Sequence, residues 1–166
     1  KCDSAYCFPN RIEEVLILQE AVRQNPSDAK SFYYLGNFWY ASRRYENAVS
    51  CWEQSATIDP EFPTVWRNLS LAYYNKCNNR EKAVAALEKA FALDNTDARI
   101  LMELDQLYKK LGRSYAERLT FLEKHVALVE SRDDLALERI TLYNQLGRYS
   151  EAKALLAARK FHPWEG

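Results

Sequence analysis

Glycine and proline are scarce in this chain of 166 residues, which has only 4 glycines and 5 prolines. A β-sandwich or barrel needs a turn about every 8–12 residues, so this scarcity argues against an all-β fold. No run of about 18 apolar residues occurs, so the sequence predicts no membrane span. Hydrophobic residues make up 48% of the chain and charged residues 28%, a balance typical of folded globular proteins rather than disordered ones.

Net charge is also absent, because 23 lysines and arginines offset 23 aspartates and glutamates. Nucleic-acid-binding proteins normally carry a basic excess, so none is expected as a partner. Neither of the two histidines, His125 and His162, has a cysteine or carboxylate at metal-ligand spacing. The adjacent acidic pairs at 13–14 and 133–134 would point in different directions on a helix. We therefore expect no catalytic residues, no metal site and no cofactor.

The four cysteines do not form the dense, evenly spaced set of a disulfide scaffold. Cys2 and Cys7 lie close together near the N-terminus, where they could pair or supply half a metal site. Cys51 and Cys77 fall inside helical patterns. Free thiols in a reducing compartment are the favoured interpretation, which predicts a cytoplasmic location.

The chain repeats itself at intervals of 34–35 residues. The segment LYKKLGR at 107–113 returns as LYNQLGR at 142–148. Upstream, the large and small residues of segment 32–39 return at the same spacing in segment 66–73. Self-similarity at a fixed period of this length is typical of a stacked repeat architecture.

These residues resemble the tetratricopeptide repeat, a helix–turn–helix unit of 34 residues. The unit at 29–62 matches the pattern at Phe32, Leu35, Gly36, Trp39, Ala48, Trp52 and Pro60. Three further units are expected near 63–97, 98–132 and 133–166. Asp105, where a small residue is usual, and Arg139 depart from the pattern. These two charged residues predict that the helices of the second half are splayed or repacked.

The resemblance implies an all-α fold, a right-handed superhelix of about four helix–turn–helix repeats plus one N-terminal helix. The array is expected at 11–159, between a ragged segment at 1–10 and a truncated tail at 160–166. Apolar residues at helical spacing and helix stops at the Asn-Pro and Asp-Pro pairs independently predict the helices. They are expected near 11–24, 28–41, 45–57, 62–75, 80–92, 97–111, 114–130, 132–146 and 149–159. Three aromatic residues are predicted to lie in the core between helices: Trp39, Tyr73 and Tyr108.

Shorter motifs carry a narrower resemblance. The segments at 104–108, 132–135 and 159–166 are similar to the tetratricopeptide part of large bacterial proteins of the domain of unknown function 5107 family. In that family a β-sandwich domain similar to sugar mutarotases precedes the repeats. Because this chain begins at Lys1 rather than methionine and stops abruptly at Gly166, we interpret it as a piece of a longer protein.

By the register of the repeat family, the first helix of each unit lines a concave groove. The resemblance implies a polar and aromatic binding patch of Tyr33, Asn37, Tyr40, Arg67, Asn68, Tyr74 and Arg99, and Leu71 is another inward position. Tyrosine and arginine are favoured anchors in binding surfaces. For each tyrosine, however, packing between repeats is an equally good interpretation.

One subclass of such arrays clamps the carboxylate of a C-terminal peptide with lysine, arginine and asparagine. Asn37, Asn68 and Arg99 stand at three of the five clamp positions. Tyr33 replaces an expected lysine, and Glu103 replaces an expected arginine. Because one cation is lost and one anion is added, most of the attraction for a carboxylate disappears. We therefore expect the groove without the full clamp.

These observations predict a non-catalytic scaffold that binds a peptide or a partner domain, including an adjacent domain of the same chain. The alternative is an accessory helical region of a carbohydrate-active or sugar-binding protein, because aromatic and amide side chains also suit sugars. The end of the chain leaves Leu155, Phe161 and Trp164 without a following helix. This apolar surface predicts either self-association or a tail folded back over the last helix.

Overall fold

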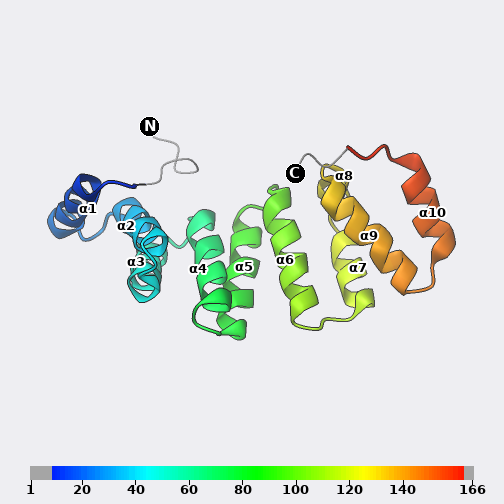
Figure 1. Ribbon diagram of the computed structural model, residues 1–166, viewed down its shortest axis with the longest axis horizontal. Coiled ribbons are helices and arrows are strands. Elements are labelled where there is room, and N and C mark those ends of the chain that lie inside the picture. The colour runs from blue at the N-terminus through cyan, green and yellow to red at the C-terminus, as the bar shows by residue number, and fades with distance from the viewer. Residues whose placement is uncertain (1–8, 163–166) are drawn as a thin grey trace. The chain divides into compact units, whose positions relative to one another are not determined.

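The computed structural model describes residues 9–162, which form ten α-helices and no β-strand (Figure 1). The expected all-α fold is confirmed, and all but one of the predicted helices begin and end within one residue of their expected bounds. Cys2, Cys7 and Trp164 lie outside the described residues. The helices are α1 (Ile12–Gln24), α2 (Ala29–Ala41), α3 (Tyr45–Ile58), α4 (Pro63–Asn75), α5 (Arg80–Leu93), α6 (Ala98–Lys110), α7 (Tyr115–Glu123), α8 (Val126–Glu130), α9 (Asp133–Gln145) and α10 (Tyr149–Ala158).

The chain divides into two compact units, Lys1–Asp94 and Asn95–Gly166. The first unit contains α1 to α5, and the second contains α6 to α10. Local sequence sets where several helices begin. The carboxylate of Asp28 accepts hydrogen bonds from the first backbone N–H groups of α2, and Asp97 caps α6 in the same way. Ser114 and Glu117 form a reciprocal capping box at the start of α7.

Four helices end through a residue with positive φ. Gly112 (φ 76°) and Gly147 (φ 73°) follow α6 and α9, and Asn78 (φ 48°) follows α4. The corresponding residue after α2 is Arg43, with φ 60°. Glycine adopts this left-handed conformation without a steric penalty, whereas a side chain with a Cβ does not. The first hairpin is therefore closed by a strained residue.

Replacing Arg43 by glycine is expected to raise the free energy of unfolding by about 0.5–1 kcal/mol, because relief of the left-handed strain exceeds the entropy cost of a more flexible unfolded chain. Urea unfolding followed by circular dichroism measures the change. The reverse substitution at the equivalent turn, Gly112→Arg, is the matched control and should lower stability by a similar amount. A loss of stability in Arg43→Gly would mean that the arginine side chain contributes a stabilising contact.

The helices of the first unit pair through small residues. A Cβ on Gly36 of α2 would lie 2.3 Å from Nε1 of Trp52 on α3, so only glycine lets the indole approach this closely. The hydroxyl of Ser55 donates to the backbone carbonyl of Ala29 at 2.7 Å, which joins the end of α3 to the start of α2. In the next hairpin, Ser70 of α4 donates to the carbonyl of Ala83 on α5 at 2.7 Å. Both hairpins are therefore antiparallel pairs.

Two of the three predicted core aromatics are confirmed, because Tyr73 and Tyr108 are buried. The prediction for Trp39 was wrong, since this side chain is only half-buried. Its ring meets Phe38 edge-on at 5.2 Å and lies under the guanidinium of Arg44 at 5.6 Å. The indole of Trp52 fills the contact between α2 and α3 instead, and Trp39 lies near the end of α2.

In the second unit a cluster of charges takes the place of small residues. Asp105 of α6 is fully buried, and Arg118 of α7 is 1% exposed. The guanidinium of Arg118 donates to both carboxylate oxygens of Asp105, at 3.0 and 2.6 Å, and to Glu138 of α9 at 2.6 Å. Lys109 donates to Glu138 at 2.9 Å. One buried arginine thus links three helices.

The environment of this cluster opposes the ionised form of one carboxylate and favours that of the other. Burial raises the pKa of Asp105 despite the hydrogen bonds from Arg118. Burial also opposes ionisation of Glu138, but hydrogen bonds from Arg118 and Lys109 outweigh it and hold the pKa of Glu138 below its usual value. In this unit α7 lies mainly against α9 rather than α6. The repacking predicted from Asp105 is confirmed.

The helix predicted at 114–130 is broken in the structure. It ends at Glu123, and α8 begins at Val126 after an interruption at Lys124 and His125. The backbone of His125 leaves the helical region (φ −126°, ψ 38°). Leu122 and Val129, which lie on either side of the interruption, are both fully buried.

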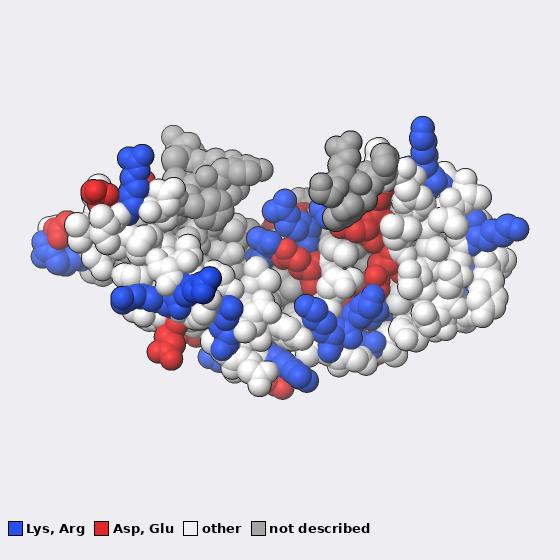
Figure 2. Space-filling model, viewed as in Figure 1, with Lys and Arg blue, Asp and Glu red and all other residues white. Residues whose placement is uncertain are grey.

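The last described residues, which follow α10, return to the start of α9. Arg159 donates to Asp133 at 2.5 Å and to Glu130 at 3.1 Å, and the backbone N–H of His162 donates to Asp133 at 2.8 Å. The backbone of His162 and the side chain of Arg159 lower the pKa of Asp133. Figure 2 shows acidic residues gathered over the region of α8 and α9. Phe161 is half-buried beside Arg159, whereas Leu156 of α10 stays 51% exposed. Self-association through this end stays a prediction.

Candidate binding site on helices α2 and α4

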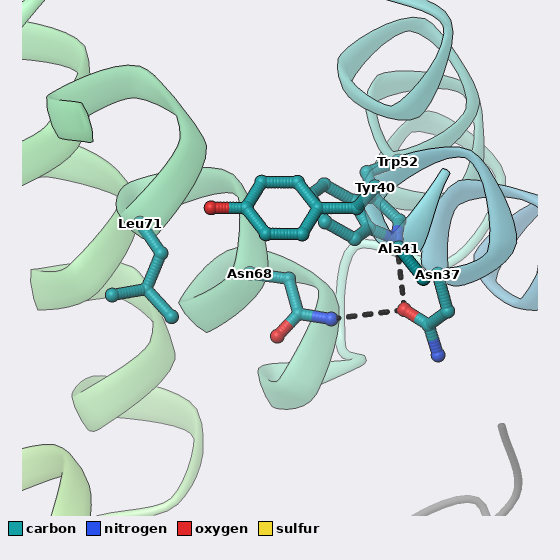
Figure 3. Close-up of a pocket in the computed structure, with 6 residues that line it drawn as sticks. All are labelled: Asn37, Tyr40, Ala41, Trp52, Asn68 and Leu71. Atoms are coloured by element: carbon teal, nitrogen blue, oxygen red, sulfur yellow. Dashed lines mark hydrogen bonds between the residues drawn. The ribbon is translucent and has the colours of Figure 1, made fainter. Parts of the chain in front are cut away.

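Two amide side chains from successive first helices meet in the first unit. Nδ2 of Asn68 on α4 donates to Oδ1 of Asn37 on α2 at 3.1 Å (Figure 3). The same oxygen accepts a hydrogen bond from Nε1 of Trp52 at 3.2 Å. The indole N–H is only a donor, so the bond fixes which end of the Asn37 amide is the oxygen.

The other end of this amide is unusual. Asn37 is 8% exposed, and its Nδ2 is buried with no hydrogen-bond partner among the described residues. A buried donor without an acceptor costs about 1–3 kcal/mol, so such groups are rare in folded proteins. Figure 3 shows this nitrogen and the oxygen of Asn68 both pointing away from the Tyr40 ring. The pair thus offers one donor and one acceptor.

A cavity of about 240 Å³ adjoins the amide pair. It is lined by Asn37, Tyr40, Ala41, Trp52, Asn68 and Leu71 (Figure 3). Tyr40 and Asn37 share one face of α2, and Asn68 and Leu71 share one face of α4, because residues three apart on a helix are neighbours. Trp52 forms the wall contributed by α3. The cavity is therefore a recess between three helices whose lining is mostly apolar.

The residues predicted for the groove do not all lie in this recess. Tyr33 is 2% exposed, with its ring 4.9 Å from Phe62 and its backbone carbonyl accepting from Trp52. Tyr33 is therefore a core residue, and its assignment to the binding surface was wrong. The alternative weighed for the tyrosines, packing between repeats, applies to this one.

The remaining predicted residues lie as follows. Tyr40 lines the cavity, and Arg67 and Tyr74 are half-buried on α4. Arg99 is exposed at the start of α6, where its backbone N–H donates to Asp97. Because Arg99 belongs to the second unit, its place on one surface with Asn37 stays a prediction.

Sequence reasoning missed two residues that form the cavity, Ala41 and Trp52. In the sequence, Trp52 stood out only as a match to the repeat pattern. A signal was present, since a buried tryptophan needs an acceptor for its indole N–H, and Asn37 on the facing helix is a suitable one. Ala41 carries no chemical signal and is found only from the geometry.

Two other cavities in the first unit have no unpartnered buried polar atom among the described residues of their walls. One of about 640 Å³ lies along α3 and α4, where Tyr73 donates to Glu53 at 2.7 Å. Burial, followed by the hydrogen bond to Glu53, raises the pKa of Tyr73. The other, of about 420 Å³, is lined by Arg43, Arg44, Tyr45, Glu46, Asn47 and Lys76. No unpartnered buried polar atom of the described chain lines either one.

Within residues 9–162 no group of three or more His, Cys, Asp or Glu side chains is placed to hold a metal ion. None of the described helices is long and apolar enough to cross a membrane.

Comparison with known proteins identifies the repeat. The tetratricopeptide repeat family matches residues 64–97. Tetratricopeptide repeat protein 37 of Xenopus laevis is 29% identical over 97 residues, a match that spans 55% of this chain. The matched region covers only 6% of the length of that relative.

Solved structures share the fold at low sequence identity. MamA superposes with a TM-score of 0.69 at 16% identity, over 85% of this chain and 81% of MamA. YrrB, described as a TPR protein with an unusual peptide-binding site, gives a TM-score of 0.69 at 20% identity, over 85% of this chain and 72% of YrrB. Residues 64–97 therefore form a tetratricopeptide repeat, in a chain that has the all-α fold of tetratricopeptide repeat proteins.

Proposed function

We propose that this chain is a non-catalytic protein-interaction scaffold that binds a peptide or a partner domain on the face formed by α2 and α4. The observation that carries the proposal is the buried Nδ2 of Asn37, which has no acceptor within the described chain. An acceptor supplied by a ligand would recover the cost of burying that donor.

A peptide group is complementary to the amide pair. Asn37 offers an N–H donor, and the oxygen of Asn68 accepts no hydrogen bond from another described residue. A peptide group presents a carbonyl acceptor and an N–H donor, so it can satisfy both. The peptide-binding site described for YrrB supports the same class of ligand.

The proposal also includes a compartment and a kind of partner. Cys51 and Cys77 are free thiols, and burial raises the pKa of Cys51 to about 11, which keeps it in the unreactive thiol form. Free thiols are typical of a reducing compartment, so we place the scaffold in the cytoplasm. The partner is a separate protein or an adjacent domain of the parent chain.

Removing the Asn68 amide is expected to weaken peptide binding about tenfold, the effect of losing one or two hydrogen bonds. Peptides selected from a random dodecapeptide library on the wild-type chain would be titrated against Asn68→Ala by fluorescence anisotropy. Gln54→Ala, an exposed residue of α3 that lines a different cavity, is the matched control and should bind normally. Equal affinities for wild type and Asn68→Ala would refute a binding role for this face.

The same protein samples can distinguish the sugar-binding alternative from peptide binding. Methyl glucoside and methyl mannoside would be titrated in parallel with the selected peptides. If the glycosides bind and Asn68→Ala abolishes that binding, the accessory role in a carbohydrate-active protein replaces the peptide scaffold.

A further inference from the structure

We infer that the cavity between α2 and α4 is a specificity pocket for one branched aliphatic side chain, in an internal and uncharged stretch of the bound peptide. The inference rests on the proposed function and adds the kind of peptide that the face selects. Four observations carry it: the walls of the cavity, its rigidity, its lack of charge and its size.

The walls present apolar surface toward the cavity from three helices. The rings of Tyr40 and Trp52 form one side, and Leu71 stands opposite them (Figure 3). Leu71 is 38% exposed, so covering it with an apolar side chain would remove further apolar area from water. Each square ångström covered contributes about 25 cal/mol.

The aromatic walls are fixed before any ligand arrives. The Tyr40 ring lies 5.4 Å from Trp52 and 5.2 Å from Tyr45. Tyr45 is itself covered by the ammonium of Lys76 at 4.2 Å. Trp52 is held by its hydrogen bonds to Tyr33 and Asn37. A preformed pocket spends little binding energy on ordering side chains.

Charge and size exclude other occupants. None of the six lining residues is charged, so an acidic or basic side chain would lose its hydration without gaining a counter-charge. The volume of about 240 Å³ lies below the roughly 300–1,000 Å³ of sites for drug-sized ligands and cofactors. A single amino-acid side chain suits a recess of this size.

The amide pair fixes where the side chain sits along the peptide. Asn37 and Asn68 themselves line the cavity, so one ligand residue can fill it while its own peptide group meets the amides. Because Asn68 is only half-buried, a change of its rotamer would open the buried Nδ2 of Asn37 to this group. Tyr33, which stands where a carboxylate clamp has lysine, is in the core. An internal peptide group is therefore preferred to a terminal carboxylate.

The test uses a minimal probe, N-acetyl-L-leucine N-methylamide, which carries one leucine side chain between two peptide groups. Its binding to the full chain would be followed through the indole N–H signal of Trp52 in ¹⁵N NMR spectra, assigned by its loss in Trp52→Phe. We expect saturation with a Kd of about 1–10 mM, the affinity that so small a ligand reaches. The alanine analogue should bind at least tenfold more weakly, since it buries three fewer carbon groups.

Two further probes and two variants sharpen the result. The glutamate analogue and N-acetyl-leucine with a free carboxylate should bind no better than the alanine analogue. Leu71→Ala should weaken the leucine probe about fivefold and leave the alanine probe unchanged. Leu137→Ala, which truncates an exposed leucine of α9 in the other unit, is the matched control and should change neither.

Each outcome decides the inference. Equal affinity for the leucine and alanine probes, tighter binding of the free acid, or no shift with any probe would overturn it. If peptides selected from the library still bind and still require Asn68, the proposed function survives and only the aliphatic pocket is lost. If neither peptides nor probes bind, both proposals fail.

Discussion

Replacing Arg118 by methionine is expected to lower the free energy of unfolding by about 3–5 kcal/mol, the usual cost of removing one partner from a buried ion pair. The substitution preserves most of the side-chain volume but leaves the carboxylate of Asp105, which has no solvent exposure, without its bidentate donor. Glu138 keeps its hydrogen bond from Lys109, so Asp105 bears the larger loss. Urea unfolding followed by far-ultraviolet circular dichroism measures the effect.

A second variant separates the loss of charge pairing from the loss of packing. Arg118→Met combined with Asp105→Leu replaces the buried pair by apolar groups, which is often neutral or stabilising. The double variant should therefore recover most of the stability that the single variant loses. A single variant that loses less than about 1 kcal/mol would mean that water reaches Asp105, contrary to the buried geometry.

The second large effect is expected at Gly36, where valine should lower the free energy of unfolding by about 2–4 kcal/mol through overpacking and lost hydrogen bonds. The new Cβ would lie 2.3 Å from Nε1 and 2.4 Å from Cδ1 of Trp52, so the indole must move. Trp52 is 3% exposed, and moving it breaks its hydrogen bonds to Tyr33 and Asn37. The unfolding midpoint in urea and the Trp52 indole signal would both change.

Ser70 is the matched control for Gly36, because it stands 34 residues later in the next hairpin. Ser70→Ala keeps a Cβ that the structure already accommodates and removes only the hydrogen bond to Ala83, at a cost of about 1 kcal/mol. In a Trp52→Leu background, Gly36→Val should cost much less than in the wild type, which a double-mutant cycle detects. Additive effects would show that Gly36 and Trp52 do not interact as the geometry requires.

The helices were predictable because their signals are local. Apolar spacing and the residues that begin and end helices place eight of the nine predicted helices to within one residue, α1 to α6 together with α9 and α10. The break at Lys124 and His125 carries no such signal, since no glycine or proline occurs between Gly112 and Gly147. The pattern of apolar residues gives no sign of it either, because Leu122 and Val129, seven residues apart, would share one face of an unbroken helix and are both buried in the structure.

The candidate site was predictable only in part. The repeat register correctly brought Asn37 and Asn68 together, because each repeat places its first helix beside the next. It wrongly assigned Tyr33 to the groove surface, since the register shows which side of a helix a residue is on but not whether its side chain is buried. The role of Trp52 depends on its close approach to Gly36, 16 residues earlier in the chain. Each residue matches the repeat pattern separately, and the pattern does not show that the two side chains meet.

Arg118 marks another limit of sequence reasoning. An arginine on a predicted helix is normally assigned to the surface, because charged side chains are rarely buried unless they are paired. The charge at Asp105 indicated repacking but did not show which residue would form an ion pair with it. The partner is Arg118, 13 residues later.

The two kinds of packing differ in how freely their parts can be exchanged. The α2–α3 hairpin is joined by a glycine, a tryptophan and a serine that lie within one repeat, so the whole contact is inherited with the hairpin and can be duplicated or transplanted intact. The cluster of Asp105, Arg118 and Glu138 draws one residue from each of α6, α7 and α9. Recombination that separated α6, α7 and α9 would leave a buried charged residue without its ion-pair partner. These three helices must therefore be inherited together, and their charged residues must change together.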